Sequence, residues 1–367
     1  MMKNLKQLLS GLIIFLFVGC STSDQYSKEV IKADQLISNV LNANNLPGIS
    51  VTILKDGNMV YSKGFGYADI EEKRKISPSN TRFRIGSFSK TLATSALMKL
   101  VEGNKINLDS SIYFYVPDYP KKRWDFTPRQ IAGHLSGMRH YRGDEMMINK
   151  NFLNVEDALS IFKTDSLLHE PETKYKYSTH SWTLLSLIIE NASGESFLDF
   201  MQTNVFDPLG MKKTHAEKVD LMGVEKVKYY YLDSTKTAVL APEVNNSWKW
   251  AGGGFISTTE DVAKFLWKHS SYDYLTEKSI IEMTTPQKTK DGKTTNYGLG
   301  WRTRYDKNNN VLIGHTGGSV GGTTYAFMAP HSNTIVVMTT NLSSASVSQF
   351  EKTSFGSLSN DLFELFE

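Results

Sequence analysis

The chain is poor in cysteine and in net charge, and both shortages narrow its possible structure. Cys20 is the single cysteine, so no disulfide forms within the chain and burial alone must hold the fold together. The formal net charge is only +3 in 367 residues and no basic block occurs, which argues against nucleic acid as a partner. The sequence has no repeat at a fixed period and no low-complexity segment. With 40% hydrophobic and 22% charged residues, its composition is that of a globular protein rather than of a disordered chain or a coiled coil.

Long apolar runs are also scarce, and the clearest one lies at the N-terminus. A short basic start is followed by a continuous apolar run from Leu12 to Val18, which is typical of a secretory signal and too short for a comfortable membrane span. Cys20 follows a small glycine and precedes polar residues, as at the site where a bacterial lipoprotein is cut and acylated. We therefore predict a lipoprotein signal peptide at residues 1–19, a polar tether at residues 20–29, and export to the bacterial cell envelope with lipidation at Cys20 as the membrane anchor. A plain secretory signal with an incidental thiol is the alternative.

The residues after the tether predict a helix followed by a hairpin. Apolar residues recur at helical spacing from Val30 to Leu41. Two β-rich runs follow, Ile49 to Leu54 and Met59 to Tyr67, and the Asp-Gly dipeptide between them favours the positive φ angles of a tight turn. These signals place an antiparallel hairpin directly behind an amphipathic helix.

The rest of the chain predicts a helical middle and a second group of strands. Residues 87–285 are mostly helical in pattern, and a C-terminal helix is expected from about Ser348. Four strands are expected before it: Tyr297 to Tyr305, Asn310 to Gly314, Thr323 to Met328 and Thr334 to Thr340. Strands at both ends indicate a mixed α/β fold of the α+β type over residues 30–367, with one antiparallel sheet built from N- and C-terminal strands, flanking helices and an inserted helical region. A cleft between the two parts is the expected active site.

A Ser-x-x-Lys pattern, which places a base one helical turn from a serine nucleophile, occurs twice. Ser87 and Lys90 open a run that suits a buried helix, so Ser87 should sit at a helix N-terminus, where unpaired N–H groups and the helix dipole favour a developing oxyanion. Ser160 and Lys163 belong to a second match, in which Ser160 lies in the middle of a helical run and has no such help. Context therefore favours Ser87, whose alternative role is an ordinary helix N-cap.

A tyrosine that could move a proton comes next along the chain. Tyr177 stands just ahead of another helical run. A nearby ammonium such as Lys90 would lower the pKa of this phenol and favour the phenolate, which could accept the proton of Ser87 and pass it to the leaving group. The alternative is a half-buried tyrosine that caps a loop.

The third motif is Gly314-His315-Thr316-Gly317-Gly318, at the end of an expected strand. Glycines on a strand edge let another backbone or a ligand approach closely. The N–H of Gly318 could then join the N–H of Ser87 in an oxyanion hole, while Thr316 and His315 meet a polar or acidic group of the substrate. A strand-end turn with a chance histidine is the alternative.

Together these motifs resemble those of a known family. Ser-Phe-Ser-Lys (87–90), Tyr-Ser-Thr (177–179) and His-Thr-Gly (315–317) are similar to the Ser-x-x-Lys, Tyr-x-Asn and Lys-Thr-Gly motifs of the penicillin-recognising serine hydrolases, and their order and spacing are closest to the class C β-lactamase branch, related to the penicillin-binding proteins. Further stretches resemble the peptidase-type, mitochondrial β-lactamase-like proteins of that branch: Leu46 to Gly48, Gly66 to Asp69, His134 to Tyr141 and Trp250 to Thr258. The resemblance covers about residues 30–345.

The resemblance implies a role for each motif residue. Ser87 would be the nucleophile, Lys90 and Tyr177 the proton-transfer pair, and the N–H groups of Gly318 and Ser87 the oxyanion donors. It implies no metal and no cofactor. Two positions depart from the β-lactamase pattern: Thr179 stands where most members have Asn, and the histidine of the third motif replaces a permanently charged Lys by a side chain that is mostly neutral at pH 7. Both departures argue against efficient β-lactam turnover.

Two further groups of residues stay open to more than one interpretation. One is a histidine-rich cluster that lacks an acidic partner at ligand spacing, so metal binding is not favoured: His134, Arg139, His140 and Tyr141. The other is the pair Trp248 and Trp250, which could line the substrate site or pack as part of a tight turn.

The expected function is that of a serine hydrolase which acts through an acyl-enzyme on an amide or ester of a small-molecule or peptide substrate. The resemblance favours a peptidase-like enzyme, and a β-lactamase or an esterase are the alternatives. A rival from another class is an inactive scaffold or binding protein at the membrane surface. The joint presence of Ser87, Lys90 and Tyr177 argues against that rival.

Overall fold

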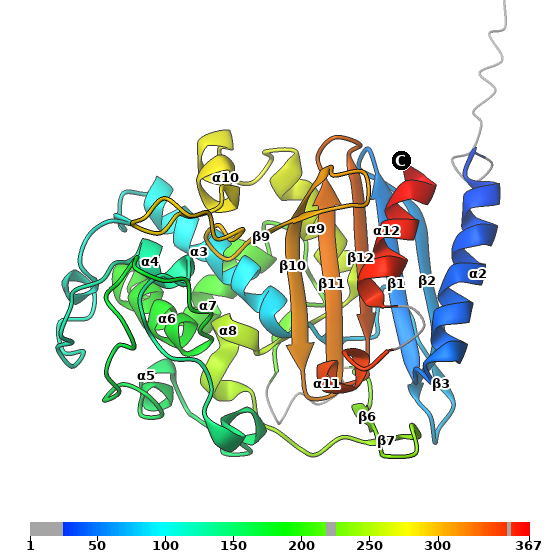
Figure 1. Ribbon diagram of the computed structural model, residues 1–367, viewed down its shortest axis with the longest axis horizontal. Coiled ribbons are helices and arrows are strands. Elements are labelled where there is room, and N and C mark those ends of the chain that lie inside the picture. The colour runs from blue at the N-terminus through cyan, green and yellow to red at the C-terminus, as the bar shows by residue number, and fades with distance from the viewer. Residues whose placement is uncertain (1–24, 218–224, 351–353) are drawn as a thin grey trace, which may run out of the picture.

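The computed structural model describes residues 25–217, 225–350 and 354–367 (Figure 1). The predicted signal peptide and Cys20 lie outside the described residues, so the predictions made for them stay predictions. The first described helix, α2, already begins at Ser27, inside the predicted tether. In the described part of the chain, no helix has both the length and the apolar character needed to cross a membrane.

A seven-stranded antiparallel sheet forms the body of the molecule, in the order β3-β2-β1-β12-β11-β10-β9. Strand β1 pairs with β12, with Ile49 opposite Thr340 and Lys55 opposite Thr334, so the sheet predicted from the two ends of the chain is confirmed. The strands are β1 (Gly48–Lys55), β2 (Asn58–Asp69), β3 (Arg74–Lys75), β9 (Arg302–Tyr305), β10 (Val311–Ser319), β11 (Gly322–Ala329) and β12 (Thr334–Thr340).

The predicted hairpin is formed by β1 and β2, which pair from Gly48 opposite Gly66 to Lys55 opposite Asn58. Asp56 and Gly57 make the turn with φ angles of 49° and 79°. Both angles are positive, as a turn that matches the right-handed twist of the strands requires.

Helices cover both faces of this sheet. α2 (Ser27–Ala43) and α12 (Phe355–Phe366) pack against each other on one face, where Figure 1 shows them in blue and red. Their buried apolar side chains share a core with strand residues such as Val51. α9 (Thr259–Ser270) packs against β1, β11 and β12. With both faces covered, β1 and β12 are buried almost throughout, including their serine and threonine side chains.

The middle of the chain forms the predicted helical region beside the sheet (Figure 1). Its α-helices are α3 (Ser89–Glu102), α4 (Pro128–Ala132), α5 (Val155–Leu159), α6 (His180–Ser193), α7 (Phe197–Met201), α8 (Trp250–Gly253) and α10 (Glu277–Thr284). Single turns are η1 (Gly86–Phe88), η2 (Ile112–Phe114), η3 (Gly143–Met147), η4 (Gln202–Phe206) and η5 (Ser247–Lys249).

The region also contains strands that the sequence pattern did not predict. β4 (Phe83–Arg84), β8 (Phe255–Ser257) and β5 (His215–Ala216) form a small sheet, and β6 (Tyr230–Leu232) pairs with β7 (Ala238–Leu240). Runs of two or three residues are too short to show a period, so only tertiary pairing defines them.

Three C-terminal boundaries differ from the predictions. The strand expected from Tyr297 begins only at Arg302, because Gly300 turns the chain with a φ of 75°. β10 continues past Gly314 to Ser319, since glycines do not stop a strand that is paired on the sheet. In place of a single helix from Ser348, α11 (Ser344–Val347) precedes α12.

Candidate functional site

Ser87 lies where the helical region meets the sheet. It belongs to η1, a single turn that leads directly into α3 and packs against β10. Ser87 is half-buried, whereas Gly86 and Phe88 on either side are buried. The placement of Ser87 at a helix N-terminus, predicted from the sequence, is confirmed.

Gly86 allows this turn to lie against the glycines of β10. Its φ is +50°, and a Cβ at this position would come within 2.7 Å of the backbone nitrogen of Gly318. A Cβ on Gly317 would likewise come within 1.9 Å of the carbonyl oxygen of Ile85. Two backbone segments therefore touch beside Ser87, and only glycine fits at the contact.

Lys90 is the buried partner of Ser87. Its Nζ lies 3.1 Å from the Ser87 Oγ, 3.2 Å from the Thr179 Oγ1 and 2.5 Å from the carbonyl oxygen of Gly252. The side chain is 0% exposed, and none of the described residues gives it a carboxylate partner. Burial, reinforced by the positive charges of Lys249 and Arg302, holds the pKa of Lys90 well below its usual range.

Tyr177 stands on the loop before α6 and reaches the same point from the other side. Its ring centre is 4.9 Å from the Lys90 Nζ, and its hydroxyl forms hydrogen bonds with Ser87 and Arg302. Burial raises the pKa of Tyr177, while Ser87 and Arg302 act in the opposite direction. The predicted shift toward a phenolate is wrong, because burial of the phenol outweighs the opposite effects of Ser87 and Arg302.

Gly318 is positioned beside Ser87 by the close contact of η1 with β10. Gly318 is exposed, while Gly317 and Ser319 on either side of it are buried. A Cβ on Gly318 would meet the Ser344 Oγ at 2.9 Å. The exposed backbone of Gly318 and the half-buried Ser87 thus border the same point.

His315 does not lie where the sequence led us to expect it. It is 0% exposed, with its Nε2 2.9 Å from the Tyr297 hydroxyl and its Nδ1 2.5 Å from the carbonyl oxygen of Thr316. Burial, with Arg302 and Lys90 nearby, holds the pKa of His315 well below its usual range. The expected contact of His315 with an acidic group of the substrate is therefore corrected to an internal one, whereas Thr316 remains half-buried at the surface.

Thr179 is also buried, with 2% of its surface exposed. Besides its contact with Lys90, its N–H donates to the His140 Nδ1, and its side chain is hydrogen-bonded to Tyr141. Gly252 packs so closely against it that a Cβ would lie 2.5 Å from the Thr179 Cγ2. This contact explains the glycine at position 252, and Thr179 holds Lys90 rather than facing the substrate.

Arg302 completes the site, and sequence reasoning missed it. The residue starts β9 opposite Gly314, is half-buried, and has its guanidinium carbon 5.3 Å from the centre of the Tyr177 ring. Its buried Nε has no hydrogen-bond partner among the described residues. No motif marks this arginine, because only the pairing of β9 with β10 brings it to the site.

The residues of the histidine-rich cluster support the site from behind. His134 is 1% exposed, accepts a hydrogen bond from the Ser178 N–H, and has its ring 4.1 Å from that of Tyr177. Arg139 pairs with Glu145 and Asp165. Trp248 and Trp250 are 1% and 8% exposed, which agrees with packing rather than with a lining role.

The second Ser-x-x-Lys match has none of this geometry. Ser160 is exposed at the C-terminal end of α5, and its hydroxyl donates to the carbonyl oxygen of Asp157 at 2.6 Å. The prediction that context favours the first match is consistent with this placement.

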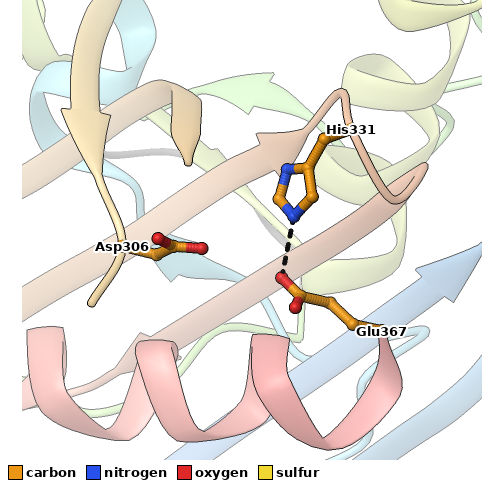
Figure 2. Close-up of side chains that lie close together, drawn as sticks. All are labelled: Asp306, His331 and Glu367. Carbon is orange, nitrogen blue, oxygen red and sulfur yellow. Dashed lines mark hydrogen bonds and ion pairs between the residues drawn. The ribbon is translucent and has the colours of Figure 1, made fainter. Parts of the chain in front are cut away.

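A group of potential metal ligands lies elsewhere, where the β9–β10 turn, the β11–β12 turn and the end of α12 meet (Figure 2). Ligand atoms of Asp306, His331 and Glu367 lie within 4.8 Å of one another. His331 is 3.1 Å from Glu367, and Asp306 accepts hydrogen bonds from the N–H groups of Asn308 and Asn310. These hydrogen bonds account for the arrangement without an ion.

Comparisons with known proteins show the family of the chain. A family model described as Beta-lactamase matches residues 33–354. The chain belongs to the Beta-lactamase family. The mitochondrial serine beta-lactamase-like protein LACTB of Homo sapiens is 29% identical over 83% of this chain and 73% of its own length.

Solved structures of other proteins share the fold. An octameric penicillin-binding protein homologue from Pyrococcus abyssi matches with a TM-score of 0.75 and 28% identity over 86% of this chain and 74% of its own. The D-amino acid amidase from Ochrobactrum anthropi SV3 matches with a TM-score of 0.78 and 22% identity over 91% of this chain and 98% of its own. The predicted superfamily and fold are confirmed. The chain is a serine hydrolase of the acyl-enzyme type.

Proposed function

We propose that this enzyme is a peptidase-like hydrolase in which Ser87 attacks the carbonyl of a peptide or a related amide. The observation that carries the proposal is the position of the Ser87 Oγ, which is 3.1 Å from the fully buried amine of Lys90 and hydrogen-bonded to Tyr177. A serine becomes a nucleophile when a base lies within hydrogen-bond reach. The same machinery would accept an activated ester.

Lys90 acts as the base in this proposal. Its lowered pKa leaves it as a neutral amine, which can donate to the carbonyl oxygen of Gly252 and to Thr179 while its lone pair accepts the proton of Ser87. Tyr177, a neutral phenol with a raised pKa, then passes a proton to the leaving group and is reprotonated from Lys90. A water molecule uses the same route in reverse to release the acyl group.

The N–H groups of Ser87 and Gly318 serve as the oxyanion donors. They border one point because Gly86 and Gly317 let η1 and β10 touch. Each such donor contributes about 3 kcal/mol to transition-state stabilisation in hydrolases of this kind.

Arg302 and Thr316 would hold the leaving-group side of the substrate. Arg302 is the cation next to Tyr177, and its Nε lacks a partner among the described residues. A carboxylate on the departing amine, such as the C-terminus of a peptide, fits this guanidinium. Most β-lactamases contact their substrate with a Lys and an Asn at the positions of His315 and Thr179. Here both positions are buried, and His315 is neutral. Efficient β-lactam hydrolysis is therefore not part of the proposal.

Intact-mass analysis after incubation with a fluorophosphonate tests the nucleophile. We expect one adduct on the wild-type domain, none on Ser87→Ala, and an unchanged adduct on Ser160→Ala. Ser160 belongs to the second Ser-x-x-Lys match and so provides the matched control. A parallel incubation with penicillin should give a persistent adduct rather than rapid turnover. A folded wild-type domain that reacts with neither reagent would favour the scaffold alternative.

We also propose that the enzyme is exported and anchored to the bacterial envelope by a lipid on Cys20. The support is the sequence pattern of residues 1–20, since these residues lie outside the described part of the chain. Metabolic labelling with an alkyne fatty acid should mark the full-length protein, and Cys20→Ser should abolish the label. A secreted, unlabelled wild-type protein would contradict the anchor.

A further inference from the structure

A second buried lysine lies beside the site without a counter-ion. Lys249 ends η5, just before α8, and is 4% exposed. Its Nζ lies 4.7 Å from the centre of the Trp248 ring and 5.3 Å from that of Tyr141, and no described residue gives it a hydrogen bond or an ion pair. A buried ammonium without a partner is costly, so proteins rarely keep one unless a ligand supplies the missing charge.

Lys249 is connected to the reacting groups through one layer of side chains. Tyr141 contacts Lys249 with its ring and is hydrogen-bonded to Thr179, which in turn lies 3.2 Å from the Lys90 Nζ. The charge of Lys249 is felt at Lys90, because it contributes to the lowered pKa of that lysine.

Glu217 is the carboxylate whose charge acts on Lys249, but its oxygens already accept hydrogen bonds from other side chains. Glu217 accepts hydrogen bonds from the Arg84 Nε at 2.8 Å, the Asn246 Nδ2 at 2.7 Å and the Tyr229 hydroxyl at 2.9 Å. Burial, together with Arg84 and against Glu217, lowers the pKa of Lys249 to about 7. The charged form of Lys249 therefore has no carboxylate paired with it among the described residues, and an incoming anion would supply one.

The position of Lys249 indicates which part of the substrate it would meet. In the proposed reaction the leaving group departs toward Tyr177 and Arg302, which lie on the side of β9. The half-buried side chains of His140 and Tyr141, whose rings stack at 4.1 Å, lie near the same reacting groups, and we place the acyl group against them. Tyr141 is the residue that contacts Lys249.

We propose that Lys249 forms a subsite for a carboxylate on the acyl part of the substrate, so that the enzyme prefers acidic acyl groups. This inference rests on the proposed function, because it needs Ser87 as the acylated residue. Arg302 and Lys249 would then form two separate subsites. Arg302 would bind a carboxylate on the leaving group, and Lys249 would bind one on the acyl group.

Two rigid p-nitrophenyl esters test the proposal, one of 4-carboxybenzoic acid and one of its neutral 4-carbamoyl analogue. A para carboxylate cannot reach its own ester carbonyl, so any preference comes from the protein. At a pH below 7, where Lys249 is mostly protonated, we expect wild-type kcat/KM to be about tenfold or more higher for the carboxylate. The ratio should fall to about 1 in Lys249→Met and persist in Lys278→Met, which removes an exposed lysine of α10.

The outcomes separate the inference from the proposed function. Fluorophosphonate labelling of Ser87 is measured on every variant, and a failure to label would contradict the function itself. Normal labelling with no carboxylate preference in the wild type overturns the subsite, even if Lys249→Met fails to fold. A preference that survives in a folded Lys249→Met variant also overturns it.

Discussion

The Lys90 Nζ lies 2.5 Å from the carbonyl oxygen of Gly252, at a point where none of the described residues supplies a carboxylate. A carbonyl oxygen accepts a hydrogen bond equally from an amine or an ammonium, so it holds the side chain in place without fixing its charge. The charge is decided instead by burial and by Lys249 and Arg302, and all three favour the neutral amine.

Replacing Lys90 by methionine should remove the base and spare the fold. We expect kcat/KM to fall about 100-fold to 10,000-fold, the usual contribution of a general base. The folded-state pKa of Lys90 is below its unfolded value, so at neutral pH folding must release a proton from Lys90 and the variant should have an equal or higher Tm. Lys99→Met on the same helix, where the Nζ donates to the Tyr274 carbonyl oxygen, is the matched control and should keep its activity. An active Lys90→Met enzyme would refute the role of Lys90.

The pH profile should show an acidic limb that belongs to Lys90. Below its pKa the amine is protonated and cannot accept the proton of Ser87, so kcat/KM should rise with pH and level off well below the usual lysine value of about 10.4. Loss of the positive charge in Lys249→Met raises the pKa of Lys90, and the limb should move to higher pH. Because burial raises the pKa of Tyr177, no basic limb is expected below about pH 10. A limb that moves to lower pH in Lys249→Met would contradict this electrostatic account.

Local rules in the sequence were sufficient for some parts of the molecule. The hairpin follows from Asp56 and Gly57, because aspartate and glycine tolerate the positive φ angles that this turn requires. The preference for Ser87 over Ser160 follows from the residues around each serine, because a helix start and the C-terminal end of a short helix differ in their neighbours.

Other parts depend on contacts between distant segments. Arg302 reaches Tyr177 only through the pairing of β9 with β10. Lys249 contacts Tyr141, more than 100 positions away in the sequence, and no described residue forms an ion pair with it. The direction of the pKa shift at Tyr177 depends on how deeply the phenol itself is buried, which the Tyr-Ser-Thr motif does not state.

His315 offers a direct check on the corrected third motif. If it bound an acidic group as an imidazolium, its ring would titrate near pH 6.5. Since burial beside Arg302 and Lys90 lowers its pKa, NMR of the imidazole should instead show one neutral tautomer from about pH 6 to pH 8. His315→Lys should lower the Tm, because it places a longer cation where the Tyr297 hydroxyl now meets a neutral ring. A ring that titrates near pH 6.5 would restore the original interpretation.

Gly86→Ala should damage the enzyme at the contact between η1 and β10. Both Gly86 and Gly143 have positive φ angles, +50° and +46°, but a Cβ on Gly86 would lie 2.7 Å from the backbone nitrogen of Gly318, whereas one on Gly143 meets nothing within 4 Å. The strained angle alone costs about 1 kcal/mol in either variant, so Gly143→Ala is the matched control. In Gly86→Ala the chain must also move η1 away from β10, which separates the two N–H groups proposed to hold the oxyanion. We expect kcat/KM to fall by about 100-fold or more in Gly86→Ala and by less than about twofold in Gly143→Ala, with thermal unfolding followed in parallel. Equal activity in the two folded variants would show that the contact between η1 and β10 does not set the oxyanion donors.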